Sequence, residues 1–214
     1  MITVVGSMKG GSGKSTVTFN LAVWLAMAEM DVLAIDLDPQ ATLRDVAEVR
    51  EEEGYKPKIK VFGKKALESD KLKTAAEVLI DVGTADLSTM KKAIAVADRV
   101  VVPVPPSQAD IWSTQRFIQF VQNLKPESTP EILGFINRGD THHAVRETDE
   151  AAAALVSLPG IKFIKPRLSQ RTIFRRSFSE GMAVFELNSK GKGSQEFTAL
   201  CAALYPQLLG NNLK

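Results

Sequence analysis

Short apolar runs separated by amphipathic segments recur along most of the chain. The runs are rich in valine, isoleucine and leucine, as in strands that are buried on both faces. They predict strands at residues 2–6, 32–35, 77–82, 99–104, 132–136 and 161–164. Residues 58–62 instead alternate between apolar and polar side chains, which predicts an edge strand.

Helical spacing of apolar residues occurs between these strands, beginning after Gly13 with Val17, Leu21 and Leu25. The same spacing predicts further helices at residues 41–53, 90–97, 117–124, 144–156 and 197–208. Strands that alternate with helices indicate an α/β fold, with a mainly parallel, doubly wound sheet and helices on both faces. Because no internal repeat or low-complexity linker divides the chain, we expect residues 1–214 to form one domain.

The composition is that of an ordinary globular chain, with 44% hydrophobic and 24% charged residues. The one cysteine, Cys201, lies between alanine and leucine, so we expect a buried thiol rather than a zinc or iron–sulfur ligand. No apolar run approaches the ~20 residues of a membrane-spanning helix. Met1 leads directly into an apolar strand, which is unlike a signal peptide, and the expected location is the cytoplasm.

A glycine-rich loop follows the first predicted strand. It reads Lys9-Gly10-Gly11-Ser12-Gly13-Lys14-Ser15-Thr16. Glycines let backbone amides turn inward around an anion, and the helix that begins near Lys14 adds the positive end of its dipole. In this pattern the lysine bridges the outer phosphates and the Ser15 hydroxyl ligates Mg²⁺. The loop therefore predicts a site for ATP and magnesium.

The loop is a variant, since Met8 stands where the general pattern has its first glycine. With Lys9 as an additional lysine, it resembles the deviant Walker A motif of the ParA/MinD family of P-loop ATPases. In that family two monomers sandwich two ATP molecules, and the additional lysine reaches the partner's nucleotide. The resemblance implies a P-loop fold, an ATP-dependent homodimer and catalytic roles for Lys14 in cis and Lys9 in trans. Hydrolysis would then depend on assembly, as with an arginine finger.

Three carboxylates extend the resemblance. Residues 35–40 read Ile-Asp-Leu-Asp-Pro-Gln and look like the family's switch I segment. By that resemblance, Asp36 holds the hydration shell of Mg²⁺ and Asp38 positions the attacking water. Asp81 closes an apolar strand and looks like the Walker B carboxylate, with Gly83 as the switch II glycine. The family often has Thr-Pro-Pro after this aspartate, so the Val-Gly-Thr found here leaves the details of switch II open.

Weaker matches lie after the later strands. Residues 102–107 resemble a family loop at which nucleotide and dimer contacts occur. Asn137 and Arg138 close the following strand, where the family commonly contacts adenine, and Pro166 follows the last strand, on the other side of the base. An ordinary loop remains an open interpretation of each.

Residues 161–179 hold six basic residues and no acidic one. The segment resembles small plasmid-type ParA proteins and the related VirC-type and McdA groups. Small ParA-type proteins bind DNA without sequence preference when ATP dimerises them. Ser169 is predicted to cap a helix on which Arg171 and Arg175 share a face. Phe174 and Phe178 are predicted to share another face of this helix, directed toward the core. The candidate contacts to DNA phosphates are Arg167, Arg171, Arg175 and Arg176.

The resemblance implies a slow ATPase, stimulated by a ParB-like adaptor, that binds DNA as a dimer and positions a cargo on the nucleoid. A MinD-like membrane-associated ATPase and a metabolic ligase or kinase on the same core remain alternatives. Polar residues Gln195, Glu196 and Thr198 flank the apolar stripe of the closing helix, which suits core packing better than membrane binding. No membrane partner is therefore expected, and His142 and His143 are interpreted as part of a polar loop. The sequence specifies neither cargo nor adaptor.

Overall fold

The fold is built on a central parallel sheet. The computed structural model describes residues 1–142 and 146–208. Its strands are β1 (Ile2–Val5), β2 (Val32–Asp36), β3 (Val61–Phe62), β4 (Glu77–Asp81), β5 (Arg99–Val104), β6 (Glu131–Ile136) and β7 (Lys162–Phe163). They lie in the order β3-β2-β4-β1-β5-β6-β7, and each neighbouring pair is parallel. The predicted α/β class with a parallel sheet is confirmed.

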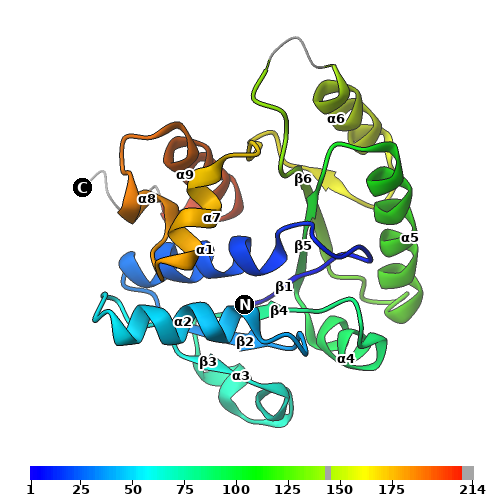
Figure 1. The fold of residues 1–214 in the computed structure, drawn as a ribbon. Coiled ribbons are helices and arrows are strands. Elements are labelled where there is room, and N and C mark those ends of the chain that lie inside the picture. Colours follow the sequence, from blue (N-terminus) through cyan, green and yellow to red (C-terminus); the bar gives the residue numbers. More distant parts are fainter. Residues whose placement is uncertain (143–145, 209–214) are drawn as a thin grey trace.

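Helices cover both faces of the sheet (Figure 1). They are α1 (Lys14–Met27), α2 (Thr42–Glu52), α3 (Lys71–Thr74), α4 (Leu87–Val96), α5 (Gln108–Leu124), α6 (Glu147–Ser157), α7 (Thr172–Ser179), α8 (Val184–Leu187), α9 (Lys192–Leu204) and the 3₁₀ turns Lys64–Glu68 and Pro206–Leu208. Helices α4, α5 and α6 lie on one face, while α1, α2 and α7 to α9 lie on the other.

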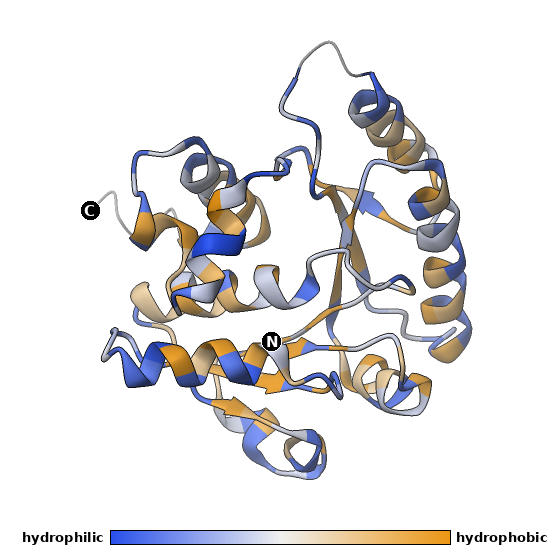
Figure 2. Ribbon diagram, viewed as in Figure 1, coloured by the Kyte–Doolittle hydropathy of each residue, from blue (hydrophilic) through white to orange (hydrophobic). Residues whose placement is uncertain are grey.

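The apolar stripes of the helices meet the strands in two main cores, one on each face of the sheet (Figure 2). On one face, Phe117 of α5 is fully buried against the strands, and on the other Phe197 and Leu200 of α9 are fully buried. Cys201 lies in the same stripe, and burial raises the pKa of its thiol. Core packing of the closing helix and a buried thiol are therefore confirmed.

Two predicted strands are shorter than expected. Only two residues of β3 pair with β2, through Ala34 with Val61 and Ile35 with Phe62, so residues 58–60 of the predicted strand lie outside it. Strand β7 likewise pairs with β6 through two residues. The predicted helix over 144–156 is seen from Glu147, and residues 143–145, with His143, lie outside the described residues. His142 is exposed.

The segment from α7 to α8 is joined to α1 and α2 through buried polar contacts. Arg50 of α2 is fully buried and forms a two-pronged ion pair with Glu186, with both N–O distances 2.8 Å. The same guanidinium donates to the carbonyl oxygens of Gly181 and Pro57. On α1, the side-chain oxygen of Asn20 accepts a hydrogen bond from the Val184 amide. None of the described helices combines the length and apolar character that crossing a bilayer would need.

Candidate nucleotide site

The loop between β1 and α1 has a backbone that glycine favours. Gly11 and Gly13 have φ angles of +76° and +89°, in the left-handed region. A Cβ on Gly13 would lie 2.5 Å from Nδ2 of Asn137, so this close approach also excludes a side chain. Helix α1 begins at Lys14, and its free amide groups and positive dipole end border the loop. The arrangement suits a bound phosphate.

Lys14 is the cation held inside this loop. Its side chain is buried, and Nζ lies 3.3 Å from both the Ser7 hydroxyl and the Lys9 carbonyl oxygen. Burial lowers the pKa of Lys14, while the carboxylates of Asp81 and Asp38 act in the opposite direction. Because these partners are weak acceptors at long distance, the ammonium is poised to exchange them for a phosphate oxygen.

Two residues that follow β6 donate hydrogen bonds to backbone carbonyl oxygens of the glycine-rich loop. Asn137 donates from Nδ2 to the Ser12 carbonyl oxygen at 2.6 Å, and Arg138 donates to the Gly11 carbonyl oxygen at 2.5 Å. The guanidinium of Arg138 also donates to Oε1 of Gln170 at 2.7 Å. The structure thus brings the predicted Asn137 and Arg138 onto the phosphate loop itself.

A cavity of about 690 Å³ opens over the loop. Its lining includes Gly10, Gly11, Gly13, Lys14, Ser15, Thr16, Val17, Asp38, Pro39, Gln40, Thr42, Thr84, Ala85, Asn137, Arg138, Leu168, Ser169, Gln170, Arg171, Phe174, Arg175, Phe178 and Phe197. Ser12 is buried beneath the loop, where its hydroxyl shares a hydrogen bond with Ser7. Pro166, which the sequence suggested on the base side, is not among the lining residues, and that wall is formed by Leu168 to Arg171. The volume is within the range typical of small-molecule sites.

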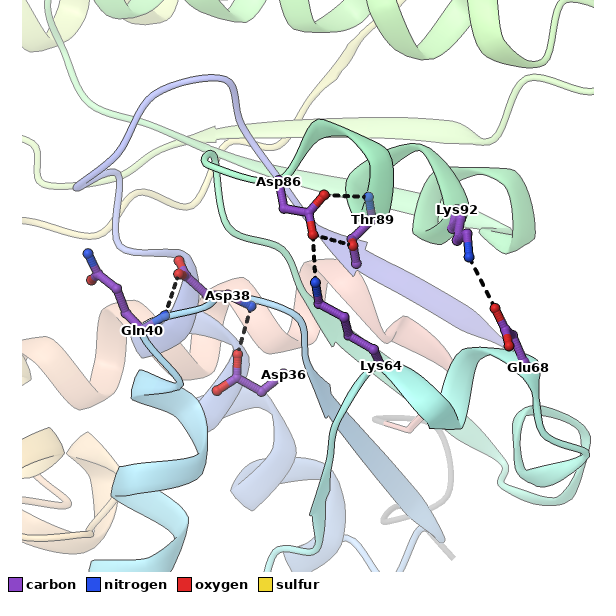
Figure 3. A network of polar contacts seen from close by, with 8 residues as sticks. All are labelled: Asp36, Asp38, Gln40, Lys64, Glu68, Asp86, Thr89 and Lys92. Carbon is purple, nitrogen blue, oxygen red and sulfur yellow. Dashed lines mark hydrogen bonds and ion pairs between the residues drawn. The ribbon is translucent and has the colours of Figure 1, made fainter.

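The two carboxylates at the end of β2 and just beyond it occupy different environments (Figure 3). Asp36 is buried and accepts hydrogen bonds from the amides of Asp38 and Arg44, each at 3.0 Å. Burial raises the pKa of Asp36, and these two amides oppose the rise. Asp38 is half-buried, lines the cavity and accepts from the Gln40 amide at 3.0 Å. Gly83 lies against it, since a Cβ there would be 2.7 Å from Cγ of Asp38.

Asp81 differs from both, because it is buried and neither carboxylate oxygen accepts a hydrogen bond of good geometry from the described residues. Burial raises its pKa to about 7, with the Ser15 hydroxyl and Lys14 acting against the rise and Asp36 adding to it. An unpaired buried carboxylate beside a serine hydroxyl is a donor set that fits Mg²⁺, which also takes phosphate oxygens and water as ligands. Within residues 1–142 and 146–208, no cluster of three or more acidic, histidine or cysteine side chains is arranged to hold a metal by itself.

A comparison with protein families decides what this arrangement belongs to. A family model described as the CobQ/CobB/MinD/ParA nucleotide binding domain matches residues 3–184. The chain belongs to this family.

Relatives within the CobQ/CobB/MinD/ParA family are similar over most of their length. "Maintenance of carboxysome distribution protein A" of Halothiobacillus neapolitanus is 22% identical over 197 residues, covering 90% of each chain. "Protein ParA" of Rhizobium radiobacter is 26% identical over 198 residues, covering 88% of this chain and 87% of that protein. The similarities therefore lie with the partition and positioning ATPases of the family.

Solved structures of family members share the fold. A plasmid partition protein from Borrelia burgdorferi bound to AMPPNP superposes with a TM-score of 0.74 at 21% identity, covering 96% of this chain and 98% of that one. An ATP complex of McdA from Cyanothece gives 0.75 at 19% identity, covering 95% of each chain. The MinC:MinD complex of Aquifex aeolicus gives 0.75 at 18% identity, covering 96% and 95%. The fold is therefore that of nucleotide-binding ATPases.

Lys9, the additional lysine of the family's loop, points away from the phosphate cavity. Its Nζ lies 2.9 Å from Oδ2 of Asp110 on α5, 101 residues later in the chain. Lys9 and Asp110 instead line a neighbouring cavity of about 560 Å³, together with Gly10, Gly11 and Arg138. The two lysines of the loop are therefore separated, with Lys14 directed into the loop and Lys9 directed out of it.

The arginine cluster differs from the sequence prediction. The amide and hydroxyl of Ser169 bind Glu196, and α7 begins only at Thr172, so Ser169 does not cap this helix. Arg171 sits at the N-cap position, outside the helix, and forms an ion pair with Glu196 at 2.7 Å. The predicted shared face of Arg171 and Arg175 is therefore wrong. The reason is a long-range carboxylate on α9, which binds both Ser169 and Arg171.

The other three arginines are more accessible. Arg167 pairs with Asp149 of α6 and Arg176 pairs with Glu180, both at 2.8 Å on exposed surface. Arg175 is exposed, borders the nucleotide cavity and has no ion pair within the described part of the chain. The aromatic pair on the opposite side of α7 packs inward as predicted, with Phe178 edge-on to Phe19 and Phe174 beside Phe197.

Local sequence patterns give little indication of the part that three features play in this region. The inward aromatic wall formed by Phe174 and Phe178 was expected only as core packing, yet both residues line the nucleotide cavity. Asp110 and Arg50 were not singled out, because each is one charged residue on an ordinary amphipathic helix. A short Ser-x-x-Asp capping pattern from Ser107 to Asp110 is the one sequence signal that could have found Asp110.

Proposed function

We propose that the chain is an ATP-switched, dimerising ATPase that binds DNA without sequence preference and positions a cargo on the nucleoid. The observation that carries this proposal is the continuity of one cavity from Lys14, in the phosphate loop, to Arg175, on α7. Nucleotide bound at one end of this cavity would contact the helix at the other end, which carries Arg175, a cation with no ion pair among the described residues. In this proposal, the bound nucleotide acts on the basic surface directly through the shared cavity, and no separate domain is needed.

Each residue of the site has a role in the proposed hydrolysis. Lys14 and the amides of the loop hold the phosphates. Ser15 and Asp81 hold Mg²⁺, and Asp36 holds water molecules in the hydration shell of the metal. Bound magnesium would neutralise the charge that develops on the transferred phosphoryl group. Asp38, beside Gly83, orients the attacking water, and Lys9 of a second copy supplies a further cation.

The proposed DNA surface is centred on Arg175 and Arg176 and excludes Arg171. Exposed pairs such as Arg176 with Glu180 contribute little to stability, so this guanidinium is free to exchange its partner for a phosphate. Arg167, paired with Asp149 in the same exposed manner, is a further phosphate contact of the same kind. Arg171, by contrast, is held by Glu196 and serves the fold.

The cargo class rests on the relatives' names. One relative is named for maintenance of carboxysome distribution and another is named ParA, and the proposal extends a positioning role of this kind to the chain. A ParB-like adaptor that accelerates hydrolysis, and so releases the DNA, completes the proposed cycle. The proposed place of action is the nucleoid.

Assembly is tested by analytical sedimentation with ATP and magnesium. The expected result is a dimer with ATP and a monomer with ADP, and a longer-lived dimer for Asp38→Ala because water activation is lost. A monomer in both the unaltered chain and Asp38→Ala at saturating ATP overturns the dimer. Fast turnover coupled to a small substrate, without any adaptor, would instead support the ligase or kinase alternative.

DNA binding is tested by fluorescence anisotropy on two duplexes of unrelated sequence, with ATP and with ADP. Affinity for both duplexes should fall equally with salt, with a log–log slope of about −0.9 per neutralised phosphate. Arg175→Glu with Arg176→Glu should weaken both duplexes alike while leaving ATP binding intact. Lys71→Glu with Lys73→Glu on α3 is the matched control, since it reverses two exposed cations at the far edge of the sheet.

Two outcomes contradict the DNA proposal. Binding to anionic liposomes but not to either duplex would favour a membrane-associated ATPase. Preference for one duplex would show that bases are read, which arginine contacts to phosphates alone cannot do.

A further inference from the structure

Lys9 forms an ion pair with a buried carboxylate of its own subunit, that of Asp110. Its ammonium lies 2.9 Å from Oδ2 of Asp110, and the side chain of Lys9 is 48% exposed whereas that of Asp110 is 7% exposed. The lysine of this pair is thus open to solvent, while the carboxylate is buried.

The position of Asp110 does not depend on Lys9. Its carboxylate also accepts a hydrogen bond from the Ser107 hydroxyl, and its own amide donates back to that hydroxyl at 3.2 Å. Asp110 lies in the first turn of the 17-residue helix α5, where the helix dipole stabilises a negative charge. The acceptor is therefore preorganised whether or not a lysine occupies it.

We propose that Asp110 is a positioning residue that latches Lys9 in cis, so that forming the ATP dimer requires each subunit to break its own Lys9–Asp110 pair. The inference rests on the proposed function, in which Lys9 acts on the nucleotide of a second copy. One ammonium cannot hold the buried Asp110 of its own chain and a phosphate of another chain at once. Asp110 thereby sets how much ATP and protein are needed before the dimer forms.

The size of the effect follows from the exposure of the pair. Ion pairs with one exposed member change an equilibrium constant by about 1.5- to 5-fold. Two pairs break in each dimer, so removing the latch should raise the dimer association constant by about 2- to 25-fold. Asp110→Asn removes the charge but keeps an oxygen for the Ser107 hydroxyl, so the helix start should survive.

The experiment measures the dimer association constant by sedimentation at saturating non-hydrolysable ATP analogue and magnesium. The full chain, Asp110→Asn, Asp110→Glu and Glu147→Gln are compared. Glu147→Gln is the matched control, since Glu147 lines the same 560 Å³ cavity and loses the same charge but has no contact with Lys9 among the described residues. We expect tighter dimers for Asp110→Asn, and values near that of the unaltered chain for Asp110→Glu and Glu147→Gln.

Every other result overturns the latch. An unchanged or weaker constant for Asp110→Asn would show that Asp110 does not compete with assembly. An equal rise of the dimer association constant in Glu147→Gln would show that the effect comes only from the net charge around this cavity. If Asp110→Asn fails to fold, Ser107→Ala loosens the same carboxylate and should tighten the dimer in the same direction, and no change in that variant refutes the proposal.

The two proposals fail in different ways. An unaltered chain that stays monomeric with the analogue overturns the dimer, and the latch with it. An unaltered chain that dimerises while Asp110→Asn does not tighten overturns the latch alone.

Discussion

At the scale of single residues, the phosphate loop depends on backbone shape as much as on charge. Gly13 combines a φ of +89° with contact to Asn137, which itself holds the Ser12 carbonyl oxygen at 2.6 Å. A side chain at this position is strained and also displaces the brace. A substitution of Gly13 should therefore disturb both the backbone shape of the loop and its hydrogen bond with Asn137.

We accordingly predict that Gly13→Ala weakens ATP binding by about tenfold or more, measured by calorimetry. Gly54→Ala is the matched control, because Gly54 also has a positive φ of +74° but a Cβ there meets nothing within 4 Å. The control should lose only about 1 kcal/mol of stability from backbone strain and bind ATP normally. Equal ATP affinities for the two variants would show that the brace does not shape the site.

A second residue-scale prediction concerns Glu196, which binds Arg171 and both polar groups of Ser169. Burial alone would raise the pKa of Glu196, but these hydrogen bonds outweigh it and lower the pKa below its usual 4.5. A lowered carboxyl pKa stabilises the fold above the unfolded value, and this stability is lost as pH falls through the folded value.

Glu196→Gln should therefore lower the free energy of unfolding by about 1–2 kcal/mol at pH 7, with a difference that shrinks below about pH 4.5. Urea unfolding across this pH range is the measurement. Glu180→Gln, which removes the exposed partner of Arg176, should change stability by only a few tenths of a kcal/mol, roughly. A Glu196→Gln deficit that grows in acid would contradict the sign of the linkage.

At the scale of elements, Arg50 joins α2 to the turn between α7 and α8. The guanidinium is fully buried, and it donates hydrogen bonds to Glu186 and to the carbonyl oxygens of Gly181 and Pro57. Glu186 also accepts from the Ala183 amide at the start of α8. Removing the cation leaves the carbonyl oxygens of Gly181 and Pro57 without this donor, and Glu186 with only the Ala183 amide.

We predict that Arg50→Met lowers the free energy of unfolding by about 3–5 kcal/mol, measured by denaturant unfolding. Arg50→Lys should recover little, because one ammonium cannot reproduce the two-pronged contact. The pair Arg50→Met and Glu186→Gln should be less damaging than Arg50→Met alone, since no unpaired carboxylate remains. A loss below about 1 kcal/mol would show that water replaces the guanidinium.

The same scale shows what the sequence could and could not predict. The buried strands were visible because each is a run of apolar residues, and the phosphate loop because its chemistry lies within eight consecutive residues. Helix α7 was predicted with the wrong start, because Ser169 binds Glu196, 27 residues away, in place of its own helix. The partner of Lys9 could not be found from spacing at all, since a separation of 101 residues carries no periodic signal.

At the scale of the whole molecule, the expected single domain can be tested with the two tryptophans. Trp24 on α1 packs near Tyr205 in the core beneath α9, with ring centroids 6.2 Å apart. Trp112 on α5 is on the other face of the sheet and is 56% exposed. The two residues thus report on opposite layers.

Single-tryptophan variants, Trp24→Phe and Trp112→Phe, should unfold in urea with coincident fluorescence and circular dichroism transitions within each variant. The layers share one sheet, so we expect neither to unfold alone. A transition reported by Trp24 that precedes loss of helix content would instead mark α1 and α9 as a separate cooperative unit.

The central place of β1 has a consequence for how the chain is made. Strand β1 precedes both of its neighbours in the sequence. It pairs with β4, where Ile2 lies opposite Val78, and with β5, where Thr3 lies opposite Arg99. The glycine-rich loop after β1 is braced by Asn137, which follows β6 and donates a hydrogen bond to the Ser12 carbonyl oxygen. A nascent chain stalled before that residue would carry the complete glycine-rich segment yet hold no shaped phosphate site. ATP should therefore begin to assist folding only once the chain has been made beyond Asn137, and non-local pairing of this kind slows folding.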